Sequence, residues 1–515
     1  MQTWLARVSR YRLRRCRDPG ELSTAYLTQA VQSDTFPVPL VAGEAALLRV
    51  FIATRRPTAE GLPPVRATFY LDGSEAYVSE IPAQTTRIPI GVNEGDLAAS
   101  VNAKIPGEII RPGLEMVVEI DPGGTLDGTV ALTNRIPATG RLRLDVRDVP
   151  ALDLTLIPFL WSEAPDSTLL GTVQEMSANP RDHELLSHTR TLLPVGDLRV
   201  TAHAPVLSSS NDPYRLYDQT RAIWTLEGQV GHYMGVLPPG KAPGVAGLAF
   251  PGGKVSVAIL RASTIAHELG HNMSLRHAPC GSVWSSSVDP EYPQTTGRIG
   301  SWGYDLQLGD LIPPSVPDLM SYCKPVWISE YHFSKALGYR MAGQYGASTT
   351  ASGAAEESLL LWGGVGVAGE PFLEPAFVVK APPVIPQPGG GAFDLVGRTA
   401  DERVLFSLSF DMPETADGEG SSAFAFLLPV ESGWVGDLAT IVLTTPAGTA
   451  TLDADTDRPM VILRNPLSGQ VRAFLRDPPP AALAGGAVDI AALSSEPDLE
   501  VLFSRGLPGP RQWRR

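Results

Sequence analysis

Three histidines and one glutamate lie close together near the middle of the chain, at a spacing that suits a metal ion. His267 and His271 are four residues apart, so on an α-helix both rings project from one face and can bind the same ion. Glu268 projects from the neighbouring face, where its carboxylate can take a proton from a metal-bound water molecule. The pattern predicts a zinc site that activates water for hydrolysis.

A third ligand is available six residues after His271, at His277. An unbroken helix would place His277 on a different face, so the chain must turn sharply for this ring to join the site. Three protein ligands with a fourth position left for water are typical of catalytic zinc, which lowers the pKa of that water to about 7. A glutamate further along the chain, Glu291 or Glu330, is the alternative third ligand.

The residues around the first two histidines favour a helix. Ile265, Leu269 and Met273 recur every four residues and would form an apolar face opposite the polar one. Ser263 or Thr264 can cap the start of this helix.

The motif resembles that of the metzincin clan of zinc endopeptidases, H-E-x-x-H-x-x-G-x-x-H followed by a methionine turn. Residues 267–272 look like the start of the motif in the adamalysin and mucin-cleaving bacterial branches. The chain differs at Ser274, which stands where the clan has the glycine that lets the third histidine swing in. A left-handed serine there would cost about 1 kcal/mol, which metal binding can offset.

The same resemblance gives roles to residues outside the motif. It implies that Met320 packs beneath the imidazoles in a methionine turn, and that the hydroxyl of Tyr322 stabilises the oxyanion. It also implies that Gly247, Leu248 and Ala249 form the edge strand to which an extended peptide substrate pairs. An ordinary methionine in the core and an ordinary buried strand are the alternatives.

The chain has three cysteines, of which Cys280 follows His277 by three residues and Cys323 follows Met320 by three. Because the metal would bring these two loops together, we expect a disulfide between Cys280 and Cys323, closing a loop of about 43 residues. Two reduced core cysteines, or a thiolate that binds zinc, are the alternatives. Cys16 faintly resembles the inhibitory cysteine of some metzincin pro-segments, with an unpaired thiol as the simpler alternative.

Composition limits the classes of protein to consider. The net charge of −14 and the pI near 5.1 argue against a nucleic-acid partner. No apolar run approaches the 18 or so residues that span a bilayer. Six arginines lie within residues 7–17 without an apolar region after them, so no signal peptide is expected. The location is not determined, although the disulfide and the resemblance favour an extracellular protein.

The chain is long enough for two or three domains, and its 50 glycines and 47 prolines suit short strands joined by turns. We expect an α+β metzincin-like catalytic domain, with a twisted mixed sheet and an active-site helix, flanked by N- and C-terminal all-β sandwich-like domains. The predicted segments are a basic N-terminal segment (1–21), an N-terminal β-domain (22–150), the catalytic domain (151–345), a linker (346–356) and a C-terminal all-β domain (357–515).

Short apolar or alternating runs between turns predict the strands of this arrangement. They lie at 26–31, 46–52, 65–71, 114–120, 152–158, 197–203, 359–362, 404–410, 423–428 and 460–464. Helices are expected at 180–193 and 214–224, and again after Ser329.

The sequence therefore predicts a zinc-dependent endopeptidase that cleaves protein or glycoprotein substrates through one catalytic ion, with Glu268 as the general base. The alternative is a non-catalytic surface-binding or adhesion protein built on a metzincin-like scaffold. The sequence does not reveal the natural substrate or the oligomeric state.

Overall fold

The computed structural model describes residues 23–33, 37–127, 130, 132–240, 244–342, 354–386, 390–431, 434, 436–478 and 498–509. The predicted basic segment 1–21 with Cys16, and residues 346–353 of the predicted linker, lie outside the described residues. The described part is mostly β-structure with five α-helices. None of those helices is long and apolar enough to cross a membrane.

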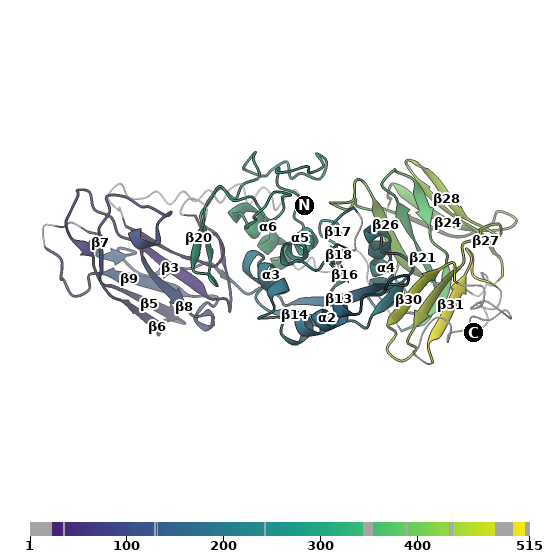
Figure 1. Cartoon of the computed structure of the whole chain (residues 1–515), viewed down its shortest axis with the longest axis horizontal. Helices are drawn as coiled ribbons and strands as arrows, with labels where there is room; N and C mark the ends of the chain where they lie inside the picture. Colours follow the sequence, from purple (N-terminus) through teal and green to yellow (C-terminus); the bar gives the residue numbers. More distant parts are fainter. Residues whose placement is uncertain are drawn as a thin grey trace. The chain divides into compact units, whose positions relative to one another are not determined.

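The chain divides into two compact units, neither of which is continuous in sequence (Figure 1). The first unit comprises Met1–Pro150 and Tyr292–Ser334, and the second comprises Ala151–Glu291 and Lys335–Arg515. The five segments expected from the sequence stay a prediction.

The first unit contains two antiparallel sheets around one apolar core. One sheet has the order β1-β3-β8, and the other has the order β10-β9-β5-β6 with β11 also paired to β9. Alternate residues of β5, namely Val65, Ala67 and Phe69, are fully buried, as expected for a strand with one face on a core. Leu48 of β3 and Met116 of β9 lie in the same core, so the two sheets share it.

The strands of the first unit have the following bounds: β1 Thr24–Thr28, β2 Leu40–Val41, β3 Ala46–Phe51, β4 Gly61–Leu62, β5 Val65–Leu71, β6 Ser74–Ile81, β7 Gln84–Arg87, β8 Val101–Ile105, β9 Glu115–Ile120, β10 Arg135–Ile136, β11 Leu142–Arg143, β12 Val146–Arg147, β19 Gly303–Asp305 and β20 Asp310–Ile312. The predicted strands at 46–52, 65–71 and 114–120 are confirmed within one residue.

The second unit is built on a nine-stranded mixed sheet with the order β17-β18-β16-β13-β15-β30-β29-β31, in which β14 also pairs with β13. The central strands β13, β16 and β18 are parallel, whereas β17 runs antiparallel to β18 at one end of the order. The bounds are β13 Leu152–Trp161, β14 Leu198–Ala202, β15 Val206–Ser208, β16 His232–Leu237, β17 Gly247–Ala249, β18 Val255–Ile259, β29 Met460–Arg464, β30 Val471–Arg476 and β31 Glu500–Ser504.

The helices are α2 Thr168–Ala178, α3 Ser187–Leu192, α4 Pro213–Leu226, α5 Ala262–Asn272 and α6 Glu330–Met341. Figure 1 shows α4 and α5 on the two sides of strands β16 to β18. Asp212 caps α4 through the backbone N–H of Tyr214 at 3.1 Å. The helix predicted at 214–224 is confirmed. The helix predicted at 180–193 is shorter in the structure, where only Ser187–Leu192 is α-helical.

The C-terminal strands of the second unit form two further sheets. Their bounds are β21 Glu356–Val365, β22 Pro371–Leu373, β23 Phe377–Ala381, β24 Phe393–Thr399, β25 Val404–Phe410, β26 Ser422–Pro429, β27 Leu438–Thr445 and β28 Gly448–Leu452. One buried core joins residues of β13 and β18 to Trp362 of β21, Leu427 of β26 and Phe474 of β30. The nine-stranded sheet and the C-terminal strands are therefore packed together.

Candidate metal centre

Helix α5 carries the first two histidines of the motif. His267 and His271 lie on it one turn apart, and both are buried, with 7% and 0% of their surface exposed. The opposite, apolar side of the helix is held by Ile265 and Leu269, which are fully buried. The predicted cap at Ser263 or Thr264 is wrong, because the helix already begins after Arg261 and both residues lie in its first turn.

The helix ends at Asn272, two residues before the serine that replaces the glycine of the motif. Ser274 has a φ of 68°, which is the left-handed conformation expected at this position. The N–H of Leu275 donates to the carbonyl of Gly270 at 3.1 Å, and the N–H of Ser274 donates to that of His271 at 2.8 Å. These bonds form a Schellman motif, which stops the helix and reverses the chain.

His277 follows this turn and is fully buried. Its backbone is fixed on both sides, since its N–H donates to the carbonyl of Ser287 and its carbonyl accepts from the N–H of Asp289. The chain thus turns back after the helix, and His277 joins the other two rings.

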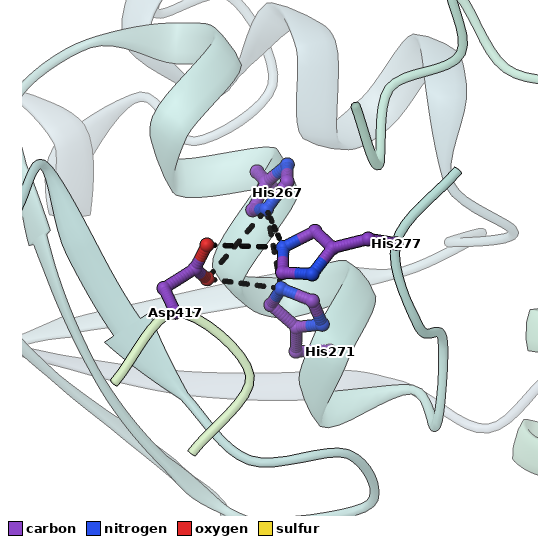
Figure 2. A group of neighbouring side chains, drawn as sticks. All are labelled: His267, His271, His277 and Asp417. Carbon is purple, nitrogen blue, oxygen red and sulfur yellow. Dashed lines mark hydrogen bonds and ion pairs between the residues drawn. The ribbon is translucent and has the colours of Figure 1, made fainter. Parts of the chain in front are cut away.

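The three imidazoles converge on one point (Figure 2). The Nε2 atom of His267 is 3.1 Å from that of His271 and 3.3 Å from that of His277. The three predicted ligands therefore come together in the folded chain.

A fourth side chain, Asp417, lies at the same point, and the sequence did not predict it. Its Oδ1 is 3.0 Å from Nε2 of His277, and its Oδ2 is 3.1 Å from Nε2 of His271 and 3.7 Å from Nε2 of His267. Asp417 is 7% exposed and comes from the segment between β25 and β26. Together the four side chains form a buried group that can hold a metal ion.

Hydrogen bonds on the outer side of two rings fix which nitrogen faces the centre. Nδ1 of His271 is 2.9 Å from the carbonyl of Leu275, which can only accept, so this nitrogen carries the proton. Nδ1 of His277 is 2.8 Å from the hydroxyl of Ser287, which itself donates to the carbonyl of Trp284. In the neutral rings, Nε2 therefore presents a lone pair to the centre, as in metal-binding histidines.

The charge state of the group also favours a cation. Burial lowers the pKa of His277 to about 4 and lowers that of His271, so both rings are neutral near pH 7. Burial alone would raise the pKa of Asp417, but its contacts with the three histidines hold that pKa well below its usual value. A carboxylate and three ring nitrogens thus meet at short distance, and this set of donors can hold a positive ion.

The spacing of the donor atoms fits zinc. Four ligand atoms arranged tetrahedrally at about 2.0–2.1 Å from a zinc ion lie about 3.3–3.4 Å from one another. The donor distances given above lie between 3.0 and 3.7 Å, and the ligand atoms of all four residues lie within 4.8 Å of one another. Nitrogen and carboxylate donors in a tetrahedral set are typical of zinc.

Glu268 lies next to this group, with 2% of its surface exposed. Burial raises the pKa of Glu268 well above its usual value, and the negative charge of Asp417 raises it further. Its Oε2 atom is buried and has no hydrogen-bond partner among the described residues. A buried carboxylate oxygen without a partner is suited to a hydrogen bond with a water molecule or a substrate.

Strand β17 passes directly over this carboxylate. A Cβ atom at Gly247 would lie 2.3 Å from Oε1 of Glu268, so only glycine allows this approach. The carbonyl of Ala246 accepts from Ile259 of β18, and hydrogen bonding alternates along an antiparallel pair. The backbone groups of Gly247 and Ala249 therefore point away from β18, toward the open edge of the sheet.

That edge is in contact with the segment that carries Asp417. The N–H of Ala416 donates to the carbonyl of Ala249 at 2.8 Å. Ala416 thus pairs with the edge strand β17, and the next residue, Asp417, places its carboxylate among the histidines.

The other predicted site residues belong to the first unit. Met320 is fully buried, and Asp318 holds its turn, since Oδ1 accepts from the N–H of Met320 at 2.8 Å. Tyr322 is 40% exposed. The roles of Met320 and Tyr322 toward the metal stay predictions.

The predicted disulfide between Cys280 and Cys323 is present. The alternatives of two reduced cysteines or a zinc-binding thiolate are thereby wrong. Glu291 and Glu330, the alternative third ligands, are not part of the metal-binding group found among the described residues.

Sequence reasoning missed Asp417 because it lies 140 residues beyond His277. The local sequence, Thr415-Ala-Asp-Gly-Glu-Gly-Ser421, indicates only a turn. No spacing rule links an aspartate in a distant turn to a helical histidine pair, so this contact depends on the tertiary fold.

A peptidase is the class of protein that comparison with known families supports. Residues 240–358 match the family described as Peptidase M66. The matched segment contains β17, α5, all three histidines and Glu268, and it ends before Asp417. No curated protein and no solved structure was found to match the chain.

Proposed function

We propose that the chain is a zinc-dependent endopeptidase of the metzincin type, which hydrolyses peptide bonds in protein or glycoprotein substrates. The observation that carries this proposal is the convergence of His267, His271 and His277 beside the buried, unpartnered oxygen of Glu268. The match to a peptidase family over the same segment supports it.

His267, His271 and His277 would hold the ion through their Nε2 atoms. When bound, zinc would lower the pKa of a coordinated water molecule and polarise the carbonyl of the scissile bond. Glu268 takes one proton from the attacking water and later delivers it to the leaving amine, so that one water is consumed for each peptide bond broken. Its burial excludes bulk solvent from this proton.

The substrate would bind as an extended strand along β17. The outward backbone groups of Gly247 and Ala249 would provide hydrogen-bonding partners for its main chain, and Gly247 lies beside Glu268. Tyr322 would donate a hydrogen bond to the developing oxyanion, and Met320 would support the rings from below, as the metzincin resemblance implies.

The test is the substitution Glu268→Gln, made in the full chain and again together with Asp417→Ala, because Asp417 fills the fourth side of the metal group. We expect zinc content to be unchanged and cleavage of an unfolded protein and of a glycoprotein to fall about 10²–10⁴-fold. Zinc is measured by elemental analysis and cleavage by mass spectrometry.

Glu291→Gln is the matched control, since Glu291 is exposed and lies outside the metal group. It should retain both zinc and activity. Cleavage by Glu268→Gln at the unsubstituted rate would show that this carboxylate is not the base.

A second function is favoured by one observation, the carboxylate of Asp417 among the histidines. Four protein ligands are typical of structural zinc, so the centre can instead be a closed one in a non-catalytic surface-binding protein. Stoichiometric zinc together with no cleavage of any peptide in a broad library, in both backgrounds, would favour this function.

A further inference from the structure

Residues 411–421, which we call the Asp417 loop, connect β25 to β26 and reach the metal centre from the C-terminal part of the chain. The loop makes two separate contacts there. Asp417 places one carboxylate oxygen on His277 and the other on His271, and Ala416 donates its N–H to the edge of β17.

These two contacts match the two needs of a bound substrate. An extended peptide would pair its main chain with the outward backbone groups of β17, which is what Ala416 does. The oxygen atoms at the scissile bond would lie where the carboxylate of Asp417 now lies, facing the three histidines (Figure 2).

The loop is held in this shape by its own hydrogen bonds. The N–H of Thr415 donates to the carbonyl of Ser421 at 2.8 Å, and the two hydroxyl groups of these residues are 2.7 Å apart. The N–H of Ser421 donates to the carbonyl of Gly418 at 2.8 Å. A Cβ atom at Gly418 would meet both hydroxyl groups, so glycine is required for this closed turn.

The ends of the loop are also fixed. Met412, at its start, is buried in an apolar core with Phe410 and Phe424. At its end, β26 pairs with β21 along eight consecutive residues. The carboxylate of Asp417 is therefore presented to the histidines by a preformed turn, so little conformational entropy is lost when it binds.

We propose that the Asp417 loop is an internal inhibitor of the metal centre, in which Asp417 is the fourth protein ligand and Ala416 occupies the substrate edge of β17. This inference rests on the proposed endopeptidase function. It assigns the unsubstituted chain a latent state, in which substrate and loop compete for the same ligand position and the same strand edge.

The test compares the full chain with Asp417→Ala and with the matched control Glu414→Ala, an exposed carboxylate of the same loop. We expect Asp417→Ala to weaken zinc binding at least about tenfold in competition with a chelator, because a ligand is lost. When Co²⁺ replaces zinc, the visible absorption spectrum of Asp417→Ala should differ from that of the unsubstituted chain. Glu414→Ala should match the unsubstituted chain in both measurements.

At zinc concentrations that saturate every variant, Asp417→Ala should cleave a peptide substrate at least about tenfold faster than the unsubstituted chain. This corresponds to a loop that weakens substrate binding to the centre about tenfold. Asp417→Asn, which keeps the size of the side chain, should also be faster, and it replaces Asp417→Ala if that variant does not fold. Glu414→Ala should cleave at the unsubstituted rate.

A direct measurement of the competition uses the Glu268→Gln chain and a peptide that the unmutated protein cleaves. We expect amide hydrogen exchange in residues 411–421 to become faster when this peptide is added at a saturating concentration. Unchanged exchange would overturn the proposal that loop and substrate share the β17 edge.

The outcomes separate this inference from the proposed function. Equal zinc affinity, spectrum and cleavage rate for Asp417→Ala and the unsubstituted chain, with cleavage abolished in Glu268→Gln, would overturn the inhibitor and leave the endopeptidase in place. Weaker zinc binding in Asp417→Ala with no cleavage by any variant would overturn the endopeptidase, and the inhibitor with it, in favour of a closed centre.

Discussion

At the scale of single residues, the centre depends on a serine in a conformation that favours glycine. Ser274 has a φ of 68° and occupies the left-handed position of the Schellman motif that ends α5. The left-handed backbone of Ser274 costs about 1 kcal/mol, which metal binding can offset because the turn brings His277 back to the helix. The strained residue thus lies between the second and the third histidine.

This strain leads to a stability prediction. We expect Ser274→Gly to raise the free energy of unfolding by about 0.5 kcal/mol, since the relief of strain exceeds the extra backbone entropy that glycine has in the unfolded chain. Ser274→Val should lower it by about 1–2 kcal/mol, because a β-branched residue tolerates this conformation poorly.

The measurement is the urea concentration at which zinc is released, because this reports unfolding of the centre itself. A glycine variant that releases zinc at lower urea than the unsubstituted chain would contradict the prediction. The valine variant then serves as the control for steric strain.

At the scale of elements, the distance between β17 and α5 is set by a missing side chain. Gly247 lies so close to Glu268 that a Cβ atom would be 2.3 Å from Oε1. In the proposed endopeptidase, the edge strand and the helix would bring a substrate backbone and Glu268 together in this arrangement only while position 247 is glycine.

We expect Gly247→Ala to lower cleavage about 100-fold, because the added methyl group must displace the Glu268 carboxylate or the strand. Zinc affinity should be unchanged, since the three atoms nearest to this methyl group's position all belong to Glu268. Cleavage and zinc affinity are measured on the same preparations, in the Asp417→Ala background as well.

Gly171→Ala is the matched control, because a Cβ atom there meets nothing within 4 Å in helix α2. It should leave cleavage unchanged. Full activity in Gly247→Ala would mean that Glu268 is not held against the strand during the reaction.

The sequence predicted the parts of the site that are close along the chain. The four-residue spacing of His267 and His271, and the apolar repeat of Ile265 and Leu269, report helix geometry directly, so α5 and the position of its two candidate ligands were predicted. The third ring was also predicted, because its distance from the helix end matched a known motif.

The parts that sequence reasoning missed depend on contacts between distant segments. Asp417 is brought to the histidines by the packing of β26 against β21 and α4, which no local pattern encodes. Helix α2 was missed even though Leu169, Val173 and Met176 form a buried stripe, because its neighbouring residues are polar and glycine-containing. Strands β16 and β18 were not predicted either, because turn signals alone do not separate them from the residues around them.

At the scale of the whole molecule, the C-terminal third is part of the structure that supports the centre. Strands β29, β30 and β31 extend the sheet that contains β13, β16 and β18. One core joins Ile157 and Val257 to Leu360 and Leu427. The segment that matches a peptidase family, residues 240–358, thus covers only part of the second unit, and it also contains residues 292–334 of the first.

We therefore expect the second unit to lose its compact fold in a chain that ends at residue 356, because the buried residues of β13 and β18 would be exposed to water. This chain should show weaker near-ultraviolet circular dichroism than the full chain, rapid digestion by trypsin within residues 151–291, and less than stoichiometric zinc. The full chain, prepared in parallel, is the control. A shortened chain that resists trypsin and binds one zinc would contradict this prediction.

The Asp417 loop is joined to β25 and β26 within the same polypeptide, so its local concentration at the histidines does not depend on how much protein is present. Dilution would therefore not relieve the block, as it would if a separate protein covered the centre. When the loop leaves the histidines, activity should appear with first-order kinetics. The rate constant should be the same at nanomolar and at micromolar protein.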